Sequence, residues 1–324
     1  MKGAYAMKPF QNILVGLDLA ACKPLTTTGL GPIPRDAFRR GVELAKMSNA
    51  RLLLFAALNV SEEALNFLQE PQRTRVVSHL VEAAERVLSV LEQDGKKEGA
   101  QASHKVVAGK GWLEIIKQVL RDHHDLVVVG TREPSAWRRL LFGNTAMKLL
   151  RRCPCPVLVN KLGAPPGPPS YLIATDLKPS SEEALRLGIA LAEAGNAHVD
   201  VLHVVEYPLD RIWASALPDS LETDYHAQIR TEAQKSLTRQ LEKTDYKKLG
   251  PNLQIHLVDG EGLPDIAIQH FLQVHGNQLL VMGTIARGGI QGIMIGNTAE
   301  RLLPEVQCSV LAVKPPDFVC PVKL

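Results

Sequence analysis

The sequence lacks several features that mark specialised classes of protein. It has only five cysteines in 324 residues, an odd number with no regular framework, which argues against a disulfide-rich secreted domain and predicts a reducing, cytoplasmic location. No apolar run approaches the ~18 residues of a membrane span, and Met1–Phe10 has no apolar core of signal-peptide length. The net charge of +3 is too small to predict binding to nucleic acid or to a membrane.

What remains is the composition of an ordinary globular protein. Hydrophobic residues make up 45% of the chain and charged residues 22%. A chain of 324 residues accommodates two domains of about 150 residues, and each would be large enough to bury its own core.

The most informative feature is an internal repeat at a fixed offset. An apolar run ending in glycine, a Gly-Asn-Thr-Ala segment and a run beginning with cysteine each occur twice, 153 positions apart. The paired landmarks are Gly130 and Gly283, Gly143 and Gly296, and Cys155 and Cys308. Three landmarks at one offset predict two copies of one domain. The Pro- and Gly-rich stretch 162–170 predicts a stiff linker between a first domain at 1–161 and a second at 171–324.

Within each copy, apolar runs alternate with helical patterns. In the second copy Tyr171–Thr175 reads as a strand, and Ser180–Glu183 after it has the Ser-Ser-Glu-Glu pattern of a capping box at a helix start. His198–Val205 then reads as the next strand. This alternation predicts an α/β fold in which each domain has a parallel, doubly wound sheet with right-handed crossovers.

Candidate site residues of the second copy gather at one edge of this predicted sheet. Ligands of doubly wound sheets bind beyond the carboxyl ends of the strands, where Asp176 and Gly283 each end a strand-like run. Gly296 opens a helix, so the amides of Asn297–Ala299 are expected to hold an anion such as a phosphate. The alternative is that Gly296-Asn297-Thr298 and Asp176 merely cap helices.

Further side chains would complete a nucleotide site at this edge. The Thr298 hydroxyl and the Asn297 amide are expected to add hydrogen bonds, and Arg287 to neutralise phosphate charge. Asp176 is expected to accept a hydrogen bond from a ribose hydroxyl or an adenine amino group. A phosphoryl-transfer enzyme is not predicted, because Gly109-Lys-Gly111 lacks the neighbouring residues of a P-loop.

The glycine spacing resembles that of the universal stress protein family, whose motif is Gly, two residues, Gly, nine residues, then Gly with Ser, Thr or Asn. The matching positions are Gly283, Ala286 and Gly296-Asn297 in the second copy, and Gly130, Glu133 and Gly143-Asn144 in the first. The resemblance covers nearly the whole chain. Segments 296–302 and 313–322 are similar to those of the E-type tandem members from proteobacteria.

The resemblance implies two Rossmann-like, flavodoxin-type domains of the adenine nucleotide alpha hydrolase-like kind, with strand order 3-2-1-4-5. It implies a stress-response binding protein rather than an enzyme, although slow ATP hydrolysis is not excluded. The implied ligand is ATP or AMP, together with Mg²⁺. By match to ATP-binding members, the ligand contacts would be Thr175, Asp176, Val204, Met282, Gly283, Arg287, Gly289, Gly296, Asn297 and Thr298.

The resemblance also implies how the domains associate. Universal stress domains usually dimerise through the last strand, so Val157–Val159 is expected to pair with Val310–Ala312 inside the chain. The two domains would then form an internal pseudo-dimer, and two chains would be free to form a homodimer.

Departures from the motif distinguish the two copies. Ala286 replaces the second glycine in one copy and Glu133 in the other, where a carboxylate would repel a triphosphate. The strand that ends His203-Val204 in the second copy ends Ala56-Ala57 in the first. We therefore expect the first site to be degenerate and the second to bind nucleotide.

Two other functions remain open at this stage. The apolar side chains within Tyr207–Pro218, with Leu221, are expected to roof a cavity or to cover the core, and a roof would favour a hydrophobic small-molecule ligand. The other function is a nucleotide-independent scaffold for partner proteins. No metal site is predicted, because His123-His124 has no partner at ligand spacing. Cys155 and Cys308 are expected to be buried structural thiols.

Overall fold

The structure is a computed structural model of the chain. It describes residues 8–20, 22, 24–58, 71–131, 143–163, 167–210, 219–260, 263–284 and 296–324. These residues form two compact units. The first unit holds the described residues up to Gly163 together with Phe318–Leu324, and the second unit holds those from Gly167 to Asp317.

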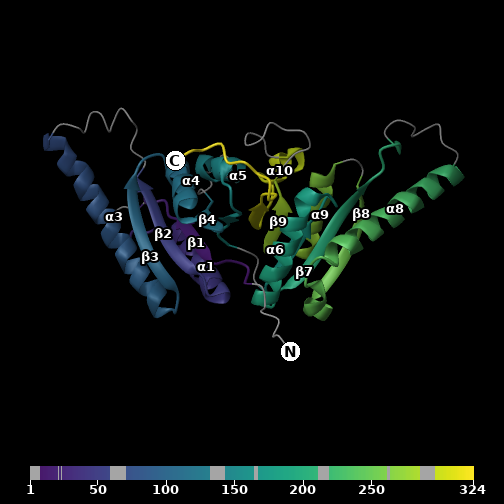
Figure 1. Cartoon of the computed structure of the whole chain (residues 1–324), viewed down its shortest axis with the longest axis horizontal. Coiled ribbons are helices and arrows are strands. Elements are labelled where there is room, and N and C mark those ends of the chain that lie inside the picture. The colour runs from purple at the N-terminus through teal and green to yellow at the C-terminus, as the bar shows by residue number, and fades with distance from the viewer. Residues whose placement is uncertain are drawn as a thin grey trace. The chain divides into compact units, whose positions relative to one another are not determined.

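The first unit is a parallel sheet with helices between successive strands (Figure 1). Its strand order is β3-β2-β1-β4-β5. The strands are β1 Asn12–Gly16, β2 Arg51–Leu58, β3 Gln101–Ala108, β4 Leu126–Gly130 and β5 Val157–Asn160. The helices are α1 Pro32–Ser48, α3 Pro71–Lys97, α4 Gly111–Asp122 and α5 Asn144–Arg152.

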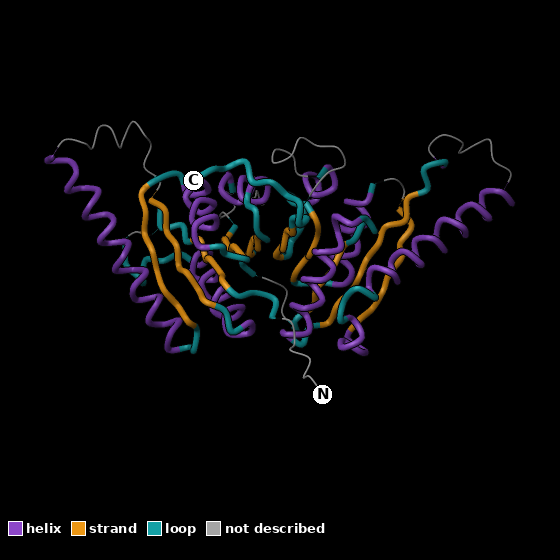
Figure 2. Tube along the Cα trace, viewed as in Figure 1, coloured by secondary structure: helices purple, strands orange, loops and turns teal. Residues whose placement is uncertain are grey.

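The second unit repeats this architecture, and Figure 2 shows the same alternation of strands and helices. Its strand order is β10-β9-β6-β7-β8. The strands are β6 Ser170–Ala174, β7 His198–Glu206, β8 Leu253–Gly260, β9 Leu279–Gly283 and β10 Ser309–Val313. The helices are α6 Pro179–Gly195, α8 Asp219–Leu241, the 3₁₀ helix η1 Tyr246–Asn252, α9 Pro264–His275 and α10 Asn297–Leu302. The predicted α/β fold and the order 3-2-1-4-5 are confirmed in each unit.

Several strands are continuous apolar runs because helices cover both faces of each sheet, so side chains on either face are buried. Val15 and Gly16 are successive residues of β1, so their side-chain positions face opposite sides. A Cβ at Gly41 of α1 would lie 2.2 Å from Val15 Cγ2, whereas a Cβ at Gly16 would lie 2.9 Å from Ile115 Cδ1 of α4. The helices α1 and α4 therefore pack on opposite faces. In the second unit α6 packs beside α8, and α9 beside α10.

The start of α6 differs from the sequence prediction. No side-chain capping bond forms, so the predicted capping box at Ser180–Glu183 is wrong. Pro179 occupies the first helical turn and moves the N-cap to Lys178, where φ is −96° and ψ is 161°. The Ser181 hydroxyl instead donates a 2.9 Å hydrogen bond to the Lys178 carbonyl. This turn faces the candidate site described below.

The cysteines are free thiols, and four of the five are buried. Cys155 and Cys308 are 8% and 4% exposed, as expected for structural positions. The neighbouring Cys153 thiol, 3.6 Å away, and burial together raise the pKa of Cys155. Cys320, in the segment of the C-terminus that belongs to the first unit, donates to the Arg152 carbonyl at 3.3 Å.

No helix in the described part of the chain combines the length and apolar character needed to cross a membrane. The predicted pairing of Val157–Val159 with Val310–Ala312 joins residues of different units and stays a prediction, as does a homodimer of chains.

Burial of His124 predicts a stability that depends on pH. Its side chain is 5% exposed, and burial lowers its pKa below the ordinary 6.5. As the pH falls through about 6.5, the unfolded chain takes up a proton that the folded chain does not, so the free energy of unfolding decreases. A His124→Leu variant should therefore lose less thermal stability than the wild type between about pH 7.5 and about pH 5.5. Equal losses in melting scans of the two proteins would contradict this prediction.

Candidate functional site

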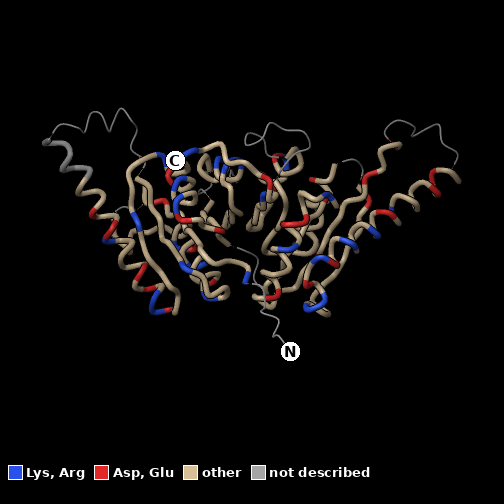
Figure 3. The backbone as a smooth tube through the Cα atoms, in the orientation of Figure 1, with Lys and Arg blue, Asp and Glu red and all other residues tan. Residues whose placement is uncertain are grey.

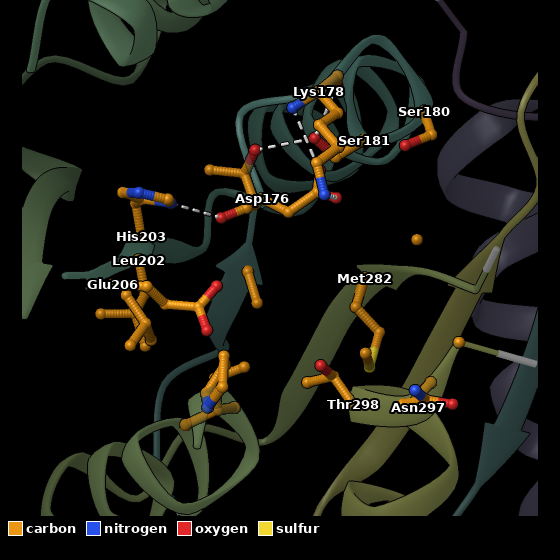
Figure 4. Close-up of a pocket in the computed structure, with 18 of the residues that line it drawn as sticks. Asp176, Lys178, Ser180, Ser181, Leu202, His203, Glu206, Met282, Asn297 and Thr298 are labelled. Atoms are coloured by element: carbon orange, nitrogen blue, oxygen red, sulfur yellow. Dashed lines mark hydrogen bonds and ion pairs between the residues drawn. The ribbon is translucent and has the colours of Figure 1, made fainter. Parts of the chain in front are cut away.

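The second unit contains a pocket of about 740 Å³ at the carboxyl ends of its strands. Residues at the ends of β6, β7 and β9 line it, together with the first turns of α6, α9 and α10. Figure 4 shows Asp176 and Lys178 on one side and Met282, Asn297 and Thr298 on the other. The pocket therefore lies where doubly wound sheets bind their ligands.

Most of the predicted site residues come together in this pocket. Those that line it are Thr175, Asp176, Val204, Met282, Gly283, Gly296, Asn297 and Thr298. Arg287 and Gly289 lie outside the described residues, as does Ala286. Whether any of these residues contacts a ligand stays a prediction.

Asp176 shapes the loop between β6 and α6 and also faces solvent. Its Oδ1 accepts a 3.1 Å hydrogen bond from the Lys178 amide, and its Oδ2 lies 3.2 Å from Lys178 Nζ. The Asp176 carboxylate thus closes a local turn before α6, and the alternative that Asp176 caps this helix is wrong, because the N-cap is Lys178 and no side-chain capping bond forms. Its side chain is nevertheless 48% exposed, so it remains accessible to a ligand at the edge of the pocket.

A buried hydrogen-bond network fixes the strand end behind Asp176. Thr175 Oγ1 lies 2.9 Å from Ser181 Oγ and 3.0 Å from Gln240 Oε1 of α8, and it accepts from the Leu177 amide. His203 Nδ1 donates to the Thr175 carbonyl at 2.9 Å, and burial lowers the pKa of His203. The neutral imidazole therefore holds the ends of β6 and β7 together at neutral pH.

Leu177, next to Asp176, has a left-handed backbone with φ of 60°. A leucine in this region costs about 1–2 kcal/mol relative to its usual conformations. Two hydrogen bonds hold this conformation in place: the Leu177 amide donates to Thr175 Oγ1, and the Lys178 amide donates to Asp176 Oδ1. The strained residue therefore lies in the loop that forms one wall of the pocket.

Replacing Leu177 by glycine is expected to leave the free energy of unfolding unchanged or to raise it by about 0.5–1 kcal/mol, because glycine adopts positive φ without strain. The matched control is Leu209→Gly, at a leucine that is 39% exposed and has no positive φ. Urea denaturation should show destabilisation in the control alone. Equal destabilisation of both variants would show that the strain at Leu177 is negligible.

Several pocket residues were missed by the sequence reasoning. They are Lys178, Ser180, Ser181, Glu206, Leu263, Ile268 and Arg301. Ser180 and Ser181 were assigned to the wrong capping box, although their place directly after the strand was a usable signal. The two Lys and Arg side chains among the described pocket residues are already paired, since Lys178 contacts Asp176 and Arg301 contacts Asp265 at 2.7 Å.

The segment opened by Gly296 is a short helix. Gly296 is the N-cap of α10 with φ of −58° and ψ of 145°, and α10 is six residues long. The first amides of a helix have no partner within it, so those of Asn297 and Thr298 are available to an acceptor. Because α10 is short, we expect these local amides to contribute more than a helix dipole.

The first unit differs at the equivalent positions. Its first helix begins Pro32-Ile33-Pro34, where α6 begins Pro179-Ser180-Ser181. A Cβ at Gly130 would lie 2.4 Å from Ile33 Cγ2, so an isoleucine packs directly against the end of β4. The sixth residue of β2 is Ala56, whereas that of β7 is His203. Apolar groups thus replace the serines and the histidine of the second unit. Glu133 lies outside the described residues.

The apolar segment after β7 is only partly described. Ile212, Trp213 and Leu217, which were expected to roof a cavity or cover the core, lie outside the described residues. Leu221 is 55% exposed at the start of α8 and therefore does not contribute to the core.

Comparison with known families explains why the two units are alike. The sequence profile of the universal stress protein family matches residues 9–161 and 171–314. The chain belongs to this family. The matched ranges leave 162–170 between them, at the predicted linker.

Among members of the universal stress protein family, the chain is similar to universal stress protein E from Escherichia coli strain K12, with 28% identity covering 98% of each chain. It is also similar to the universal stress protein E homolog of Haemophilus influenzae, with 27% identity covering 94% of this chain and 98% of the relative. A solved universal stress protein from Archaeoglobus fulgidus shares the fold at 18% identity, with a TM-score of 0.66, and covers 94% of this chain and 98% of its own length. A functionally unknown protein from Pseudomonas aeruginosa also has a TM-score of 0.66, at 21% identity, over 96% of this chain and 95% of its own.

Proposed function

We propose that this tandem universal stress protein is a stress-response binding protein that holds an adenine nucleotide, ATP or AMP, in its second unit. The observation that carries the proposal is that Asp176, the end of β9 at Gly283 and the start of α10 at Gly296 line one pocket. Residues from distant parts of the sequence thus meet at the ligand-binding edge of a doubly wound sheet.

The chemistry of the pocket wall supports a nucleotide. Leu202, Val204 and Met282 supply an apolar surface suited to the face of a purine ring. The Asp176 carboxylate supplies an acceptor for a ribose hydroxyl or an adenine amino group. On the opposite side, the amides and side chains of Asn297 and Thr298 supply donors for phosphate oxygens. Mg²⁺ would accompany ATP and neutralise phosphate charge, since both described cations of the pocket are already paired.

Binding rather than catalysis is the role that these residues fit. Among the described residues, the two carboxylates lining the pocket are those of Asp176 and Glu206. Asp176 is held by Lys178 in a local turn, which suits an anchoring role more than proton transfer. We propose that the protein acts in the cytoplasm as a nucleotide-responsive sensor without an enzymatic reaction of its own.

Calorimetric titration of the full chain with ATP and with AMP, each with and without Mg²⁺, tests the proposal. We expect one site per chain, because the serines and His203 of the second unit are replaced by apolar residues in the first. If millimolar nucleotide produced neither heat nor a shift in melting temperature, the proposal that the protein binds an adenine nucleotide would be wrong.

A hydrophobic small molecule is the second candidate ligand. The apolar wall continues through Leu263 and Ile268, and a largely apolar pocket wall suits a hydrophobic ligand. Native mass spectrometry of freshly purified protein distinguishes the two ligands by the mass that remains bound. If the protein is instead a scaffold for partner proteins, the mass spectrum should show neither a bound nucleotide nor a bound hydrophobic molecule.

A further inference from the structure

A group of metal-ligating side chains lies just beyond the end of β7, outside the set that lines the pocket. It consists of Asp210, Glu222 and His226, whose ligand atoms all lie within 4.8 Å of one another. Asp210 follows β7, and Glu222 and His226 are four residues apart on α8, so their side chains share one face of the helix. We call these three residues the 210/222/226 cluster.

The imidazole of the cluster is held in position by its neighbours. His226 Nε2 lies 3.0 Å from both carboxylate oxygens of Asp210. The ring stacks on Tyr207, with centroids 3.9 Å apart and planes 26° apart, and it contacts Tyr225 at 5.6 Å. The Tyr225 hydroxyl in turn accepts a 3.2 Å hydrogen bond from the Leu209 amide. The nitrogen that faces the carboxylates is therefore presented in a fixed direction, as a metal site requires.

Among the described residues, no Lys or Arg pairs with the two carboxylates of the cluster. Asp210 and Glu222 place two carboxylates around one imidazole. Within the described part of the chain, Glu222 has no ion pair. Figure 3 shows only acidic charge in the first turns of α8, and the first basic residue of that helix is Arg230, which pairs with Asp259 at 2.6 Å. A bound cation would relieve the repulsion between the two carboxylates.

We propose that the 210/222/226 cluster is a binding site for a divalent transition-metal cation of the zinc class. One nitrogen and two carboxylate oxygens are ligands that zinc accepts, and three protein ligands leave a position open to water. The cation binds the lone pair of His226 Nε2, and the proton through which this nitrogen bonds Asp210 moves to Nδ1 or to solvent. Ligands of a tetrahedral zinc lie roughly 3.4 Å apart, so closing the site from 4.8 Å requires a movement on the order of 1 Å, within reach of the exposed Glu222 side chain.

Occupation of the site would fix the start of α8 to the end of β7. Glu206, the last residue of β7, lines the pocket, and Tyr207 directly after it carries the stacked imidazole. Asp210, the first ligand of the cluster, thus follows the pocket residue Glu206 by four positions, and the stacked Tyr207 lies between them in the chain. The proposal does not depend on which ligand, if any, the pocket holds.

Zinc titration against a chromophoric chelator, using the full chain and three variants, tests the site. His226→Ala removes the nitrogen, and Glu222→Gln removes one charge without changing the size of the side chain. The matched control is His79→Ala, which deletes an exposed histidine beside Glu82 on α3, a His–Glu pair of similar chemistry with a 3.7 Å separation.

We expect one zinc ion per wild-type chain, affinity at least tenfold weaker in His226→Ala and in Glu222→Gln, and no change in His79→Ala. Zinc should also raise the melting temperature of the wild type but not that of His226→Ala. Melting scans without metal verify that each variant is folded, and Glu222→Gln, at an exposed position, keeps the test valid if His226→Ala is unstable. Absence of a stoichiometric site in the wild type, or full affinity in both cluster variants, would overturn the proposal.

Discussion

A Gly296→Asp variant should fold normally and lose ATP binding by at least about 100-fold. Gly296 is the N-cap of α10 with an extended backbone that aspartate adopts readily, and aspartate is a favourable N-cap. The substitution would place a carboxylate in the pocket beside the amides that are expected to hold phosphate. Repulsion between this carboxylate and a polyphosphate, together with occupation of the amides, removes the site without disturbing the sheet. Calorimetric titration with ATP and Mg²⁺ measures the loss.

Gly143→Asp is the matched control for this experiment. Gly143 is the N-cap of α5 with φ of −59° and ψ of 156°, nearly the same backbone as Gly296. Because apolar Ile33 packs against the strand end of the first unit, we expect ATP binding to be unchanged in this variant. Retained binding in Gly296→Asp would contradict the predicted site, and loss of binding in Gly143→Asp would assign it to the first unit instead.

Asp200→Ala should lower the free energy of unfolding of the second unit by about 3 kcal/mol. Asp200 is 2% exposed, and its carboxylate accepts 2.8 Å hydrogen bonds from His256 of β8 and from Asn277, which precedes β9. Asn277 also donates to the Ser170 hydroxyl at 2.9 Å. Removing the carboxylate leaves buried donors without an acceptor and disconnects several strands at once. Urea denaturation, combined with hydrogen exchange of the β7 and β8 amides, measures the effect.

The control is Asp259→Ala near the other end of the same sheet. Asp259 is also a hydrogen-bonded carboxylate, contacting Tyr207 and Arg230 at 2.6 Å, but its side chain is 59% exposed. Water can replace these bonds, so the expected loss is below about 1 kcal/mol. Comparable losses in the two variants would show that burial of Asp200 is not what makes its network stabilising.

The architecture could be predicted from sequence because local patterns determine it. Apolar runs ending at Gly130 and Gly283 read directly as strands, since a strand covered on both faces has no polar side. The repeat then assigned the same topology to both halves. The start of α6 could not be predicted in this way, because Pro179 and the Ser-Ser-Glu-Glu pattern favour different helix starts. The helix begins at Pro179, as the proline favours.

Only those residues of the candidate site that belong to a recognisable sequence motif could be predicted. Asp176, Gly283 and Gly296 follow recognisable strand and helix boundaries, and the structure brings them into one pocket. Glu206 carries no motif, and its place in the pocket depends on where β7 ends. The 210/222/226 cluster has ligand spacing only between its two helical members, because Asp210 reaches them through the folded chain.

Assignment of Phe318–Leu324 to the first unit has a consequence for biosynthesis. This segment, including Cys320 with its bond to the Arg152 carbonyl, is translated after the second unit. At about 5–20 residues per second, the remainder of the chain after residue 163 takes on the order of ten seconds or more to be made, and the first unit lacks one of its own segments throughout that time. The first unit therefore reaches its final form only after the second has been translated, and a fragment cut at the linker would be a truncated version of it.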